Sequence, residues 1–458
     1  MKHRGFQESS GGRDPTVLIV GGGLAGMTAA HHIAEWGADV ILVDSAPHIG
    51  GAFLHLDHTF TTDTCGLCLA LPRQPSLCPT LASADHPRID TLPSTTLVGL
   101  EGEPGRFVAA LRRDARLIDP DRCDSCGACA EVCPVTRQDP AWGRFLGEDP
   151  MLRKAVYPAP PRAVPTSYAI DSEACTRCGA CVAACPQDAI DLDAAGGVEE
   201  RAVAAVVVAP GFTPFDAGRA VEYGWGRCEN VVTSLELERM LNRSGPTKGR
   251  ILRPSDGQVP GRIGFIHCVG SRSETLGRPY CSSSCCMITA KQVGLSHEAV
   301  PDAALTVFTM DVRTAGKGYE RYFERVAGLP GVTYRRERPA AVHELPGSRD
   351  LRLLTSQGEE VVELLVLAVG MGPAEHVEEL AEAAGFAIDE YGFILPGDEG
   401  PGSTSRRGVF SAGHGVAPAD VPETVTQAEA AAALATGMLS PALAAGVADA
   451  ERAWGDDA

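Results

Sequence analysis

The chain has 458 residues, of which 44% are hydrophobic and 22% are charged, a composition typical of soluble globular domains. Its 40 basic and 59 acidic residues give a formal charge of −19, which argues against nucleic-acid binding, because that requires a positive surface. No run of 18 or more apolar residues occurs, so no membrane span is predicted. Residues 1–15 lack the apolar region of a signal peptide and are predicted to be a disordered lead-in. The 16 cysteines then favour metal binding in a reducing cytoplasm over disulfides.

Residues 16–44, "TVLIVGGGLAGMTAAHHIAEWGADVILVD", predict a strand, a glycine turn, a helix and a second strand. Gly21, Gly23 and Gly26 form a G-x-G-x-x-G pattern, which permits a tight turn, close approach of backbone to a pyrophosphate, and close helix packing. Asp44 ends the second strand, where an acid accepts a hydrogen bond from a ribose hydroxyl. We therefore predict a dinucleotide site; the alternative is a glycine turn without a ligand.

A first group of cysteines follows at Cys65, Cys68 and Cys78. The C-x2-C pair could complete a metal cluster, cycle as a disulfide near the cofactor, or pack without reacting. A ligand role is disfavoured, because no fourth ligand is evident nearby. Cys228 stands alone and is interpreted as structural.

One cysteine pattern occurs twice, in "CDSCGACAEVCP" and "CTRCGACVAACP". Both copies have the spacing C-x2-C-x2-C-x3-C-P of two-cluster ferredoxins, in which three thiolates hold one [4Fe–4S] cluster and the fourth ligates the other. The expected ligand sets are Cys123, Cys126, Cys129 and Cys185 for one cluster, and Cys175, Cys178, Cys181 and Cys133 for the second. Structural zinc is the alternative, but zinc sites use C-x2-C pairs at longer separation.

Short strands are expected around the two copies, in "RLIDPDRC", "YAIDSEAC" and "QDAIDLD". The long segment between the copies contains the proline-rich "RKAVYPAPPRAVP", which is predicted to be extended and to wrap the surface. The ferredoxin unit therefore looks like an insertion into a dinucleotide-binding domain.

Two apolar stretches that end on glycine, residues 204–216 with Gly211 and residues 363–373, resemble the crossings between the FAD and NAD(P) domains of two-dinucleotide-binding flavoproteins. Residues 406–439 resemble the second FAD motif of that superfamily, with a strand that ends at Gly413 and a helix from about Glu423. The resemblance implies that the cofactor is FAD. In this superfamily Asp usually follows the glycine; here it is His414, which puts one ribityl contact in doubt.

Residues 261–292 occupy the position where such flavoproteins carry a second glycine loop for NAD(P)H. A strand is predicted at 263–267, but "CVGSR" stands in for the phosphate loop, so direct NAD(P)H binding there is disfavoured. The four thiols of this stretch are placed at the start of the next helix or before it: Cys268, Cys281, Cys285 and Cys286. A third iron–sulfur cluster is the preferred interpretation; a redox-active thiol pair and inert buried cysteines are the alternatives.

These motifs together resemble the FAD/iron–sulfur protein family of heterodisulfide reductase, its A-type subunit, over nearly the whole chain. The stretches that carry the resemblance are "GGAFLHLDHTFTTDTCGLC", "RKAVYPAPPRAVP", "HCVGSR", "YCSSSCC", "MDVRTAGKGYERYFERVAG" and "VPETVTQAEAAAA". Within them Gly51 and Thr424 are expected to contact FAD. The basic residues of "MDVRTAGKGYERYFERVAG" form either a surface for a partner or a solvated helix face.

The resemblance implies an α/β two-dinucleotide-binding flavoprotein, Rossmann-like and thioredoxin reductase-like, with an inserted α+β dicluster ferredoxin domain. The FAD domain is expected at 16–115, the ferredoxin insert at 116–195, and the middle of the FAD domain with the crossing at 196–260. A second Rossmann-like domain is expected at 261–370, followed by the last part of the FAD domain at 371–458.

The implied function is that of an FAD and [4Fe–4S] electron-transfer subunit, in some complexes of the family an electron-bifurcating one. Implied partners are cluster-binding subunits and a hydrogenase- or dehydrogenase-type donor, with ferredoxin and a second copy of the chain as further candidates. The disulfide-cleaving site of the family lies in another subunit. The competing hypotheses are a self-contained NAD(P)H-dependent flavin oxidoreductase and a relay or assembly scaffold.

Overall fold

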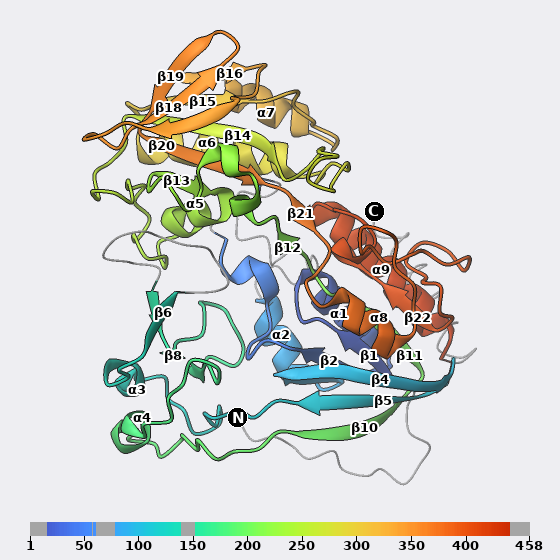
Figure 1. Ribbon diagram of the computed structural model, residues 1–458. Helices are drawn as coiled ribbons and strands as arrows, with labels where there is room; N and C mark the ends of the chain where they lie inside the picture. Colours follow the sequence, from blue (N-terminus) through green and yellow to red (C-terminus); the bar gives the residue numbers. More distant parts are fainter. Residues whose placement is uncertain (1–15, 57, 61–77, 139–151, 440–458) are drawn as a thin grey trace, which may run out of the picture.

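The computed structural model describes residues 16–56, 58–60, 78–138 and 152–439. The predicted lead-in and two of the predicted cysteines, Cys65 and Cys68, lie outside these ranges. The described chain forms two units, each built around a parallel sheet, and a smaller insert that carries the repeated cysteine pattern (Figure 1).

The first unit is a five-stranded parallel sheet made of segments that are far apart in the sequence. Its strands, in spatial order, are β22 (Val409–Ser411), β11 (Ala205–Val208), β1 (Thr16–Val20), β2 (Asp39–Asp44) and β3 (Ile89–Pro93). The helices of this unit are α1 (Leu24–Glu35), α2 (Pro79–Asp85), α8 (Val377–Ala384) and α9 (Val421–Gly437). A three-stranded antiparallel sheet joins it, made of β4 (Thr95–Glu103), β5 (Arg106–Arg113) and β10 (Gly197–Val203).

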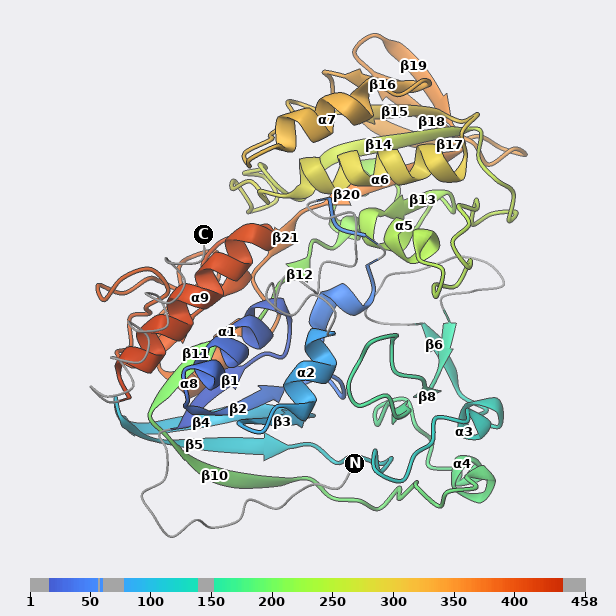
Figure 2. The same cartoon turned by 180° about the vertical axis from the view of Figure 1, so that it is seen from behind.

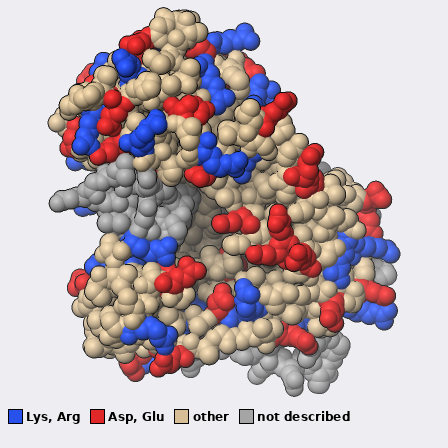
Figure 3. Space-filling view, in the orientation of Figure 1, with Lys and Arg blue, Asp and Glu red and all other residues tan. Residues whose placement is uncertain are grey.

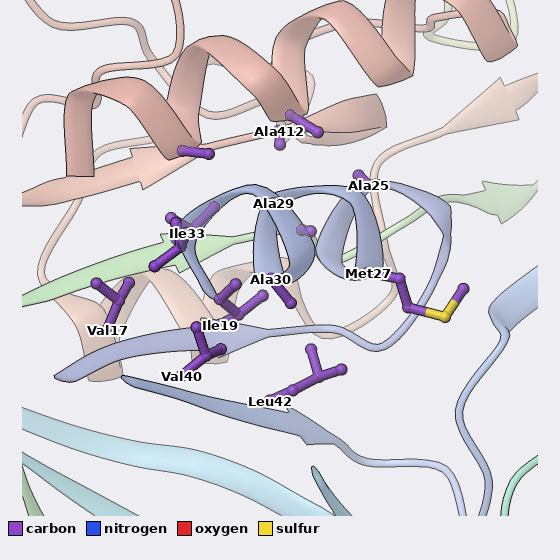
Figure 4. Close-up of a cluster of buried hydrophobic side chains, with 14 of the residues drawn as sticks. Val17, Ile19, Ala25, Met27, Ala29, Ala30, Ile33, Val40, Leu42 and Ala412 are labelled. Atoms are coloured by element: carbon purple, nitrogen blue, oxygen red, sulfur yellow. The ribbon is translucent and has the colours of Figure 1, made fainter. Parts of the chain in front are cut away.

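The strands of the first unit are apolar along their whole length because both of their faces are covered. Val17 and Ile19 on β1 pack against α1 and α9, as the close-up in Figure 4 shows for α1. Leu18, between them, points to the opposite face and packs with the antiparallel sheet and α8. The predicted strand–turn–helix–strand order is thus observed.

The second unit has the same three-layer plan. Its parallel sheet consists of β13 (Val231–Thr233), β20 (Leu364–Val369), β14 (Arg262–Val269), β15 (Ala304–Phe308) and β16 (Val332–Arg335). One face is covered by α5 (Ser234–Leu241), α6 (Cys285–Ala299) and α7 (Tyr319–Ala327), of which α6 and α7 are clearest from behind (Figure 2). The other face is covered by β17 (Ala341–Glu344), β18 (Leu351–Thr355) and β19 (Gly358–Val362).

The boundary between the two units differs from the expected one. We expected residues 196–260 to remain with the FAD domain, but β13 pairs with β20 in the second sheet, and α5 packs on that sheet. The chain crosses to the second unit at β12 (Thr213–Pro214) and returns at β21 (Met371–Gly372). These two short strands pair with each other, so both predicted crossings meet in one antiparallel ladder.

The insert leaves the first unit after β5 and returns at β10. Because these strands are neighbours, with Arg113 opposite Gly197, the insert extends a hairpin and does not interrupt the sheet. Its elements are α3 (Ala128–Glu131), β6 (Thr136–Gln138), β7 (Leu152–Lys154), β8 (Val156–Tyr157), β9 (Ala169–Ile170) and α4 (Ala180–Ala184). The expected flanking strands are short: β9 pairs with β8, and Ile118 makes a single bridge to Ile190.

None of the helices in the described ranges combines the length and the apolar character that crossing a bilayer requires.

Candidate nucleotide and iron–sulfur sites

The turn between β1 and α1 leaves no space for side chains. Gly21 has φ +109°, and a Cβ there would overlap the carbonyl oxygen of Ala209 on the neighbouring strand connection. A Cβ at Gly26, in the first turns of α1, would overlap the carbonyl oxygen of Gly21. Gly23 is the N-cap of α1, so the free N–H groups of the helix start directly after it. This geometry permits a phosphate to approach backbone and helix dipole together.

Asp44, at the end of β2, is held by the same turn. Its Oδ2 accepts the N–H of Gly22 at 2.7 Å and its Oδ1 accepts the N–H of Ala46 at 2.8 Å. Burial raises the pKa of this carboxyl, and the two backbone hydrogen bonds oppose that rise. Each carboxylate oxygen retains a free lone pair, so Asp44 can still accept from a ribose hydroxyl.

A cleft with a volume of about 1370 Å³ lies between the first and the second unit. Figure 3 shows this face of the molecule hollowed between its upper and lower parts, with acidic side chains beside the hollow. The cleft contains seven of the eight predicted nucleotide residues: Gly21, Gly23, Asp44, Gly51, Gly211, Gly413 and Thr424. The eighth, Gly26, serves the packing of α1 against the turn. This volume exceeds that of a pocket for a drug-sized ligand and is large enough for a dinucleotide.

The C-terminal wall of the cleft is formed by β22, a short 3-10 turn at Gly413–Gly415, and α9. The helix begins at Val421, slightly earlier than expected. His414 replaces the usual aspartate and is buried; its Nδ1 accepts the N–H of Ala419 at 3.4 Å, and its ring lies 5.0 Å from that of Phe212. Burial lowers the pKa of His414 to about 4, so at neutral pH this position presents a neutral imidazole.

The second unit contributes a buried charged pair that sequence reasoning missed. Lys291 on α6 forms an ion pair with Glu238 on α5, and Gln292 donates to the same carboxylate at 2.6 Å. All three side chains line the cleft. Buried charges are retained in pairs because isolated ones are costly, so the pair places a fixed dipole beside the cofactor cleft. No local pattern predicts it, because its members lie on different helices.

The first predicted cluster set surrounds one cavity. Cys123, Cys126, Cys129 and Cys185 all line it, together with Tyr168. The fourth ligand is thus drawn from the second copy of the pattern, as the ferredoxin spacing predicts. Burial raises the pKa of the Cys129 thiol to about 11, and the neighbouring thiols add to the rise.

The second set is grouped around α4. Burial raises the pKa of Cys181, and the charges of Cys175 and Cys178 raise it further. Cys133 is buried in the same core as Cys181, and its carbonyl oxygen accepts from Lys154 Nζ at 2.7 Å. Among the described residues no three His, Cys, Asp or Glu side chains converge on a point suited to a single metal ion. The first set instead encloses a cavity, as a multi-atom cluster requires.

Three thiols of the third group are in mutual contact. Cys285 is hydrogen-bonded to both Cys268 and Cys286. This contact lowers the pKa of Cys268 to about 7 and that of Cys286 to about 4, and it raises the pKa of Cys285. Cys285 also lines the nucleotide cleft. Cys281 differs from the expectation: α6 begins at Cys285, so Cys281 lies half-buried in the preceding loop.

Two further cysteines have no cluster around them in the described part of the chain. Cys78 contacts the hydroxyl of Thr80 at 3.1 Å, and Cys228 is buried in the core of the second unit.

The proline-rich segment, residues 155–167, lies between the insert and the cleft; we call it the strap. Val164 accepts the N–H of Ile49 at 2.9 Å, and the carbonyl oxygen of Pro165 lies 3.0 Å from His48 Nδ1. At its other end, Thr166 accepts from the hydroxyl of Ser125, inside the first cysteine loop, at 2.8 Å. The strap therefore fastens that loop to the segment that leads into Gly51.

Comparisons with known protein families match two parts of the chain. Residues 122–190 match a 4Fe-4S dicluster domain, and residues 19–69 match an NAD(P)-binding Rossmann-like domain. Together with the sheet order, these matches confirm the predicted α/β fold with an inserted dicluster ferredoxin unit.

Similar curated proteins come from methanogenic archaea. The chain is 37% identical, over 92% of its length, to the A-type subunit of H(2):CoB-CoM heterodisulfide,ferredoxin reductase of Methanothermobacter marburgensis. It is 39% identical over 94% of its length to an iron-sulfur subunit, again A-type, of CoB–CoM heterodisulfide reductase of Methanopyrus kandleri. It covers 63% and 64% of these two relatives, so the chain spans less than two thirds of their length. These similarities confirm the resemblance predicted from the motifs.

Among solved structures, thioredoxin reductase of T. acidophilum is 15% identical, with a TM-score of 0.47, and the match covers 93% of this chain and 98% of that one.

Proposed function

Because this chain is similar to the FAD/iron–sulfur protein of heterodisulfide reductase over more than nine tenths of its length, we propose that it is an oxidoreductase subunit that passes electrons between FAD and [4Fe–4S] clusters. One observation carries the proposal: the predicted nucleotide residues meet in a single cleft, and the strap fastens the first cysteine loop beside it. When bound, a flavin accepts electrons in pairs, whereas the clusters carry them singly.

FAD is proposed as the nucleotide because the cleft is bounded both by the β1–α1 turn and by the β22–α9 segment. In this arrangement the glycine turn and the start of α1 hold the pyrophosphate, and Asp44 accepts from the ribose. Gly51 and Gly211 leave room for the cofactor along the cleft, while Gly413 and Thr424 present the end of β22 and the start of α9 to the flavin side.

Two [4Fe–4S] clusters are proposed for the insert. The first set is supported by the shared cavity of Cys123, Cys126, Cys129 and Cys185. The second set is Cys175, Cys178, Cys181 and Cys133, supported by the electrostatic coupling of its first three members and by the burial of the fourth in the same core.

A third cluster is proposed on Cys268, Cys281, Cys285 and Cys286. The contact among three of these thiols and the lowered pKa values of Cys268 and Cys286 support thiolate ligands. The competing form of the proposal is a redox-active thiol pair, which the same contacts would also serve. Iron content separates the two.

We further propose that the chain acts within a cytoplasmic multisubunit complex. The proposed partners are cluster-binding subunits and a hydrogenase- or dehydrogenase-type donor, with ferredoxin or a second copy of the chain as additional partners. Nucleic acid is not among them, given the charge of −19. Splitting of an electron pair between two acceptors is the finer form of the activity; its test is reduction of a low-potential acceptor only when a high-potential acceptor is also present.

The alternative function is a self-contained NAD(P)H-dependent flavin oxidoreductase, which the Rossmann-like second sheet favours. Against it, Cys268 and Cys285 stand where a pyridine nucleotide would need a glycine loop. Rapid bleaching of the flavin by NADH or NADPH, in purified holoprotein, would support this alternative.

The decisive experiment is analysis of anaerobically prepared protein for iron, acid-labile sulfide and FAD. About eight irons per FAD correspond to two clusters and about twelve to three. Reduced protein should also give the electron paramagnetic resonance of [4Fe–4S] clusters. Fully reconstituted protein without flavin absorbance, or without cluster resonance, would contradict the proposed function.

A further inference from the structure

The connection between β15 and α7, residues 309–318, reaches from the second unit to the first. Arg313 and Lys317 on it are exposed, but Tyr319, which opens α7, is half-buried. The phenol of Tyr319 donates to Asp420 Oδ2 at 2.6 Å, across 101 positions of sequence. Burial raises the pKa of Tyr319, and the carboxylate of Asp420 raises it further, so the phenol keeps its proton at neutral pH.

Asp420 is also the residue that starts α9. Its Oδ1 accepts the N–H of Glu423 at 2.9 Å, and its own N–H donates to Glu423 Oε2 at 3.0 Å, which completes a capping box. Its two carboxylate oxygens thus have different partners, one inside the helix and one in the other unit. Because Asp420, Val421 and Thr424 line the cleft, the bond from Tyr319 orients the end of α9 that faces the cofactor.

The other end of the same connection is anchored beside the third cysteine group. Thr309 lies 3.0 Å from His267 Nδ1, and the carbonyl oxygen of Asp311 accepts from Cys286 Sγ at 3.9 Å. The carboxylate of Asp311 forms a bidentate pair with Arg272. The connection is therefore held at its start in the second unit, and Tyr319 transmits that position to the first unit.

An aromatic contact closes the same edge of the cleft. The ring of Phe60, a cleft residue, meets the ring of Tyr319 edge to face at 5.1 Å. Tyr319 is thus in contact with two parts of the first unit that border the cofactor space, one through its hydroxyl and one through its ring.

We propose that Tyr319 is a positioning residue: its hydroxyl latches the second unit to the N-terminus of α9 and so holds the cleft in the geometry that binds FAD. The inference depends on the proposed function only for the identity of the cofactor. It assigns a role to one member of a segment whose charged residues are otherwise solvated.

The test compares the whole chain with its Tyr319→Phe variant, in which the ring and its contact with Phe60 remain. Apoprotein is titrated with FAD, and the dissociation constant is followed by flavin fluorescence. We expect the constant to rise about fivefold, the effect of losing one hydrogen bond to a carboxylate at a half-exposed site. The matched control is Tyr322→Phe, one turn further along α7 and packed on the second core, which should leave the constant unchanged.

Asp420→Ser makes the test specific. Serine retains the cap of α9 but cannot reach Tyr319. If the latch is the unit that acts, the double variant binds FAD no more weakly than the weaker single variant, whereas independent effects would multiply. The flavin midpoint potential should shift together with affinity, a readout that a merely stabilising contact would leave in place.

A second measurement needs no cofactor. In apoprotein, amide hydrogen exchange of residues 421–424 should be faster in Tyr319→Phe than in wild type. Equal exchange, or equal FAD affinity within about twofold, overturns the latch. Failure of wild type to bind FAD at all would instead overturn the proposed function, and the exchange experiment would still decide on the latch.

Discussion

The two units of this protein share one plan but have opposite chemistry at the same junction. In the first, β1 runs into α1 through Gly21 and Gly23, and the turn is so close that a side chain at Gly21 would overlap Ala209. In the second, β14 runs toward α6 through Cys268, and Cys285 and Cys286 occupy the first helical positions. Cys268 even adopts φ +58°, a conformation that favours glycine.

The comparison shows what a strand–turn–helix junction can do. A helix N-terminus attracts negative charge. Where the turn is bare, that charge can come from a ligand phosphate. Where the turn carries thiols, it comes from the protein's own thiolates, which cysteines of lowered pKa supply. The same fold therefore offers one unit for a nucleotide and the other for thiolate chemistry.

The largest effect is expected from filling the bare junction. Gly26→Ala should abolish FAD binding and lower the free energy of unfolding by about 3 kcal/mol, because the new methyl group overlaps the backbone of Gly21. FAD content after reconstitution and urea unfolding measure the two effects. Gly437→Ala, at the end of α9 with open space around it, is the control and should behave as wild type. Normal flavin content in Gly26→Ala would refute the assigned role of the turn.

Next come the thiol positions, measured as iron per protein. Cys129→Ser removes a ligand of the first set and should lower iron by about four atoms. Cys285→Ser should lower it by a similar amount if the second junction holds a cluster. Equal iron in anaerobically prepared wild type and Cys285→Ser would contradict the third cluster and leave the thiol-pair interpretation. Cys228→Ser, in the core of the second unit, is the matched control and should keep all of its iron.

A smaller effect concerns acid stability of the first unit. His414 has a pKa of about 4 in the folded protein, below the usual 6.5, so it is neutral when folded. Below pH 6.5 the unfolded chain takes up a proton that the folded chain does not, so stability falls as pH falls from 6.5 toward 4. Between about pH 7 and pH 5 this one group should cost about 2 kcal/mol.

The check is urea unfolding of apoprotein at both pH values. His414→Gln should lose about 2 kcal/mol less than wild type over this interval. An identical pH dependence in the two proteins would show that His414 is protonated in the folded state.

The smallest effects come from helix caps, which allow a direct comparison of the units. Asp420 caps α9 in the first unit and Thr233 caps α5 in the second, each within a capping box. Replacement of either by alanine should cost about 1 kcal/mol in unfolding free energy. Only Asp420→Ala should also weaken FAD binding, because only that cap borders the cleft beside α9. Equal FAD affinities of the two variants would contradict this asymmetry.

Much of the site was predictable because it rests on local covalent spacing. The glycines of the first turn, the acid at Asp44 and the two cysteine patterns each require a fixed number of residues between functional groups. The strand and turn around them follow from apolar runs and glycine, so sequence alone identified them. The exchange of Cys185 into the first set also follows from spacing, and the cavity brings those four residues together.

Other features were not predictable because they depend on how distant segments pack. The pair of Lys291 and Glu238 joins two helices, and each residue alone resembles an ordinary surface charge. The boundary near β13 was misplaced because a short apolar strand does not determine which sheet it will join. The strap's proline-rich sequence predicted extension but not the hydrogen bonds that fasten it.

The sequence by itself determined the chemistry of this protein: which residues can approach a phosphate, which thiols can share a cluster, and in which order they occur along the chain. Tertiary structure alone decided that two Rossmann-like units face one cleft, and that Tyr319 reaches Asp420 across it. The physical reason is range. Turn geometry and ligand spacing act over a few residues, whereas the pairing of buried charges, sheets and domain surfaces depends on contacts that no local pattern records.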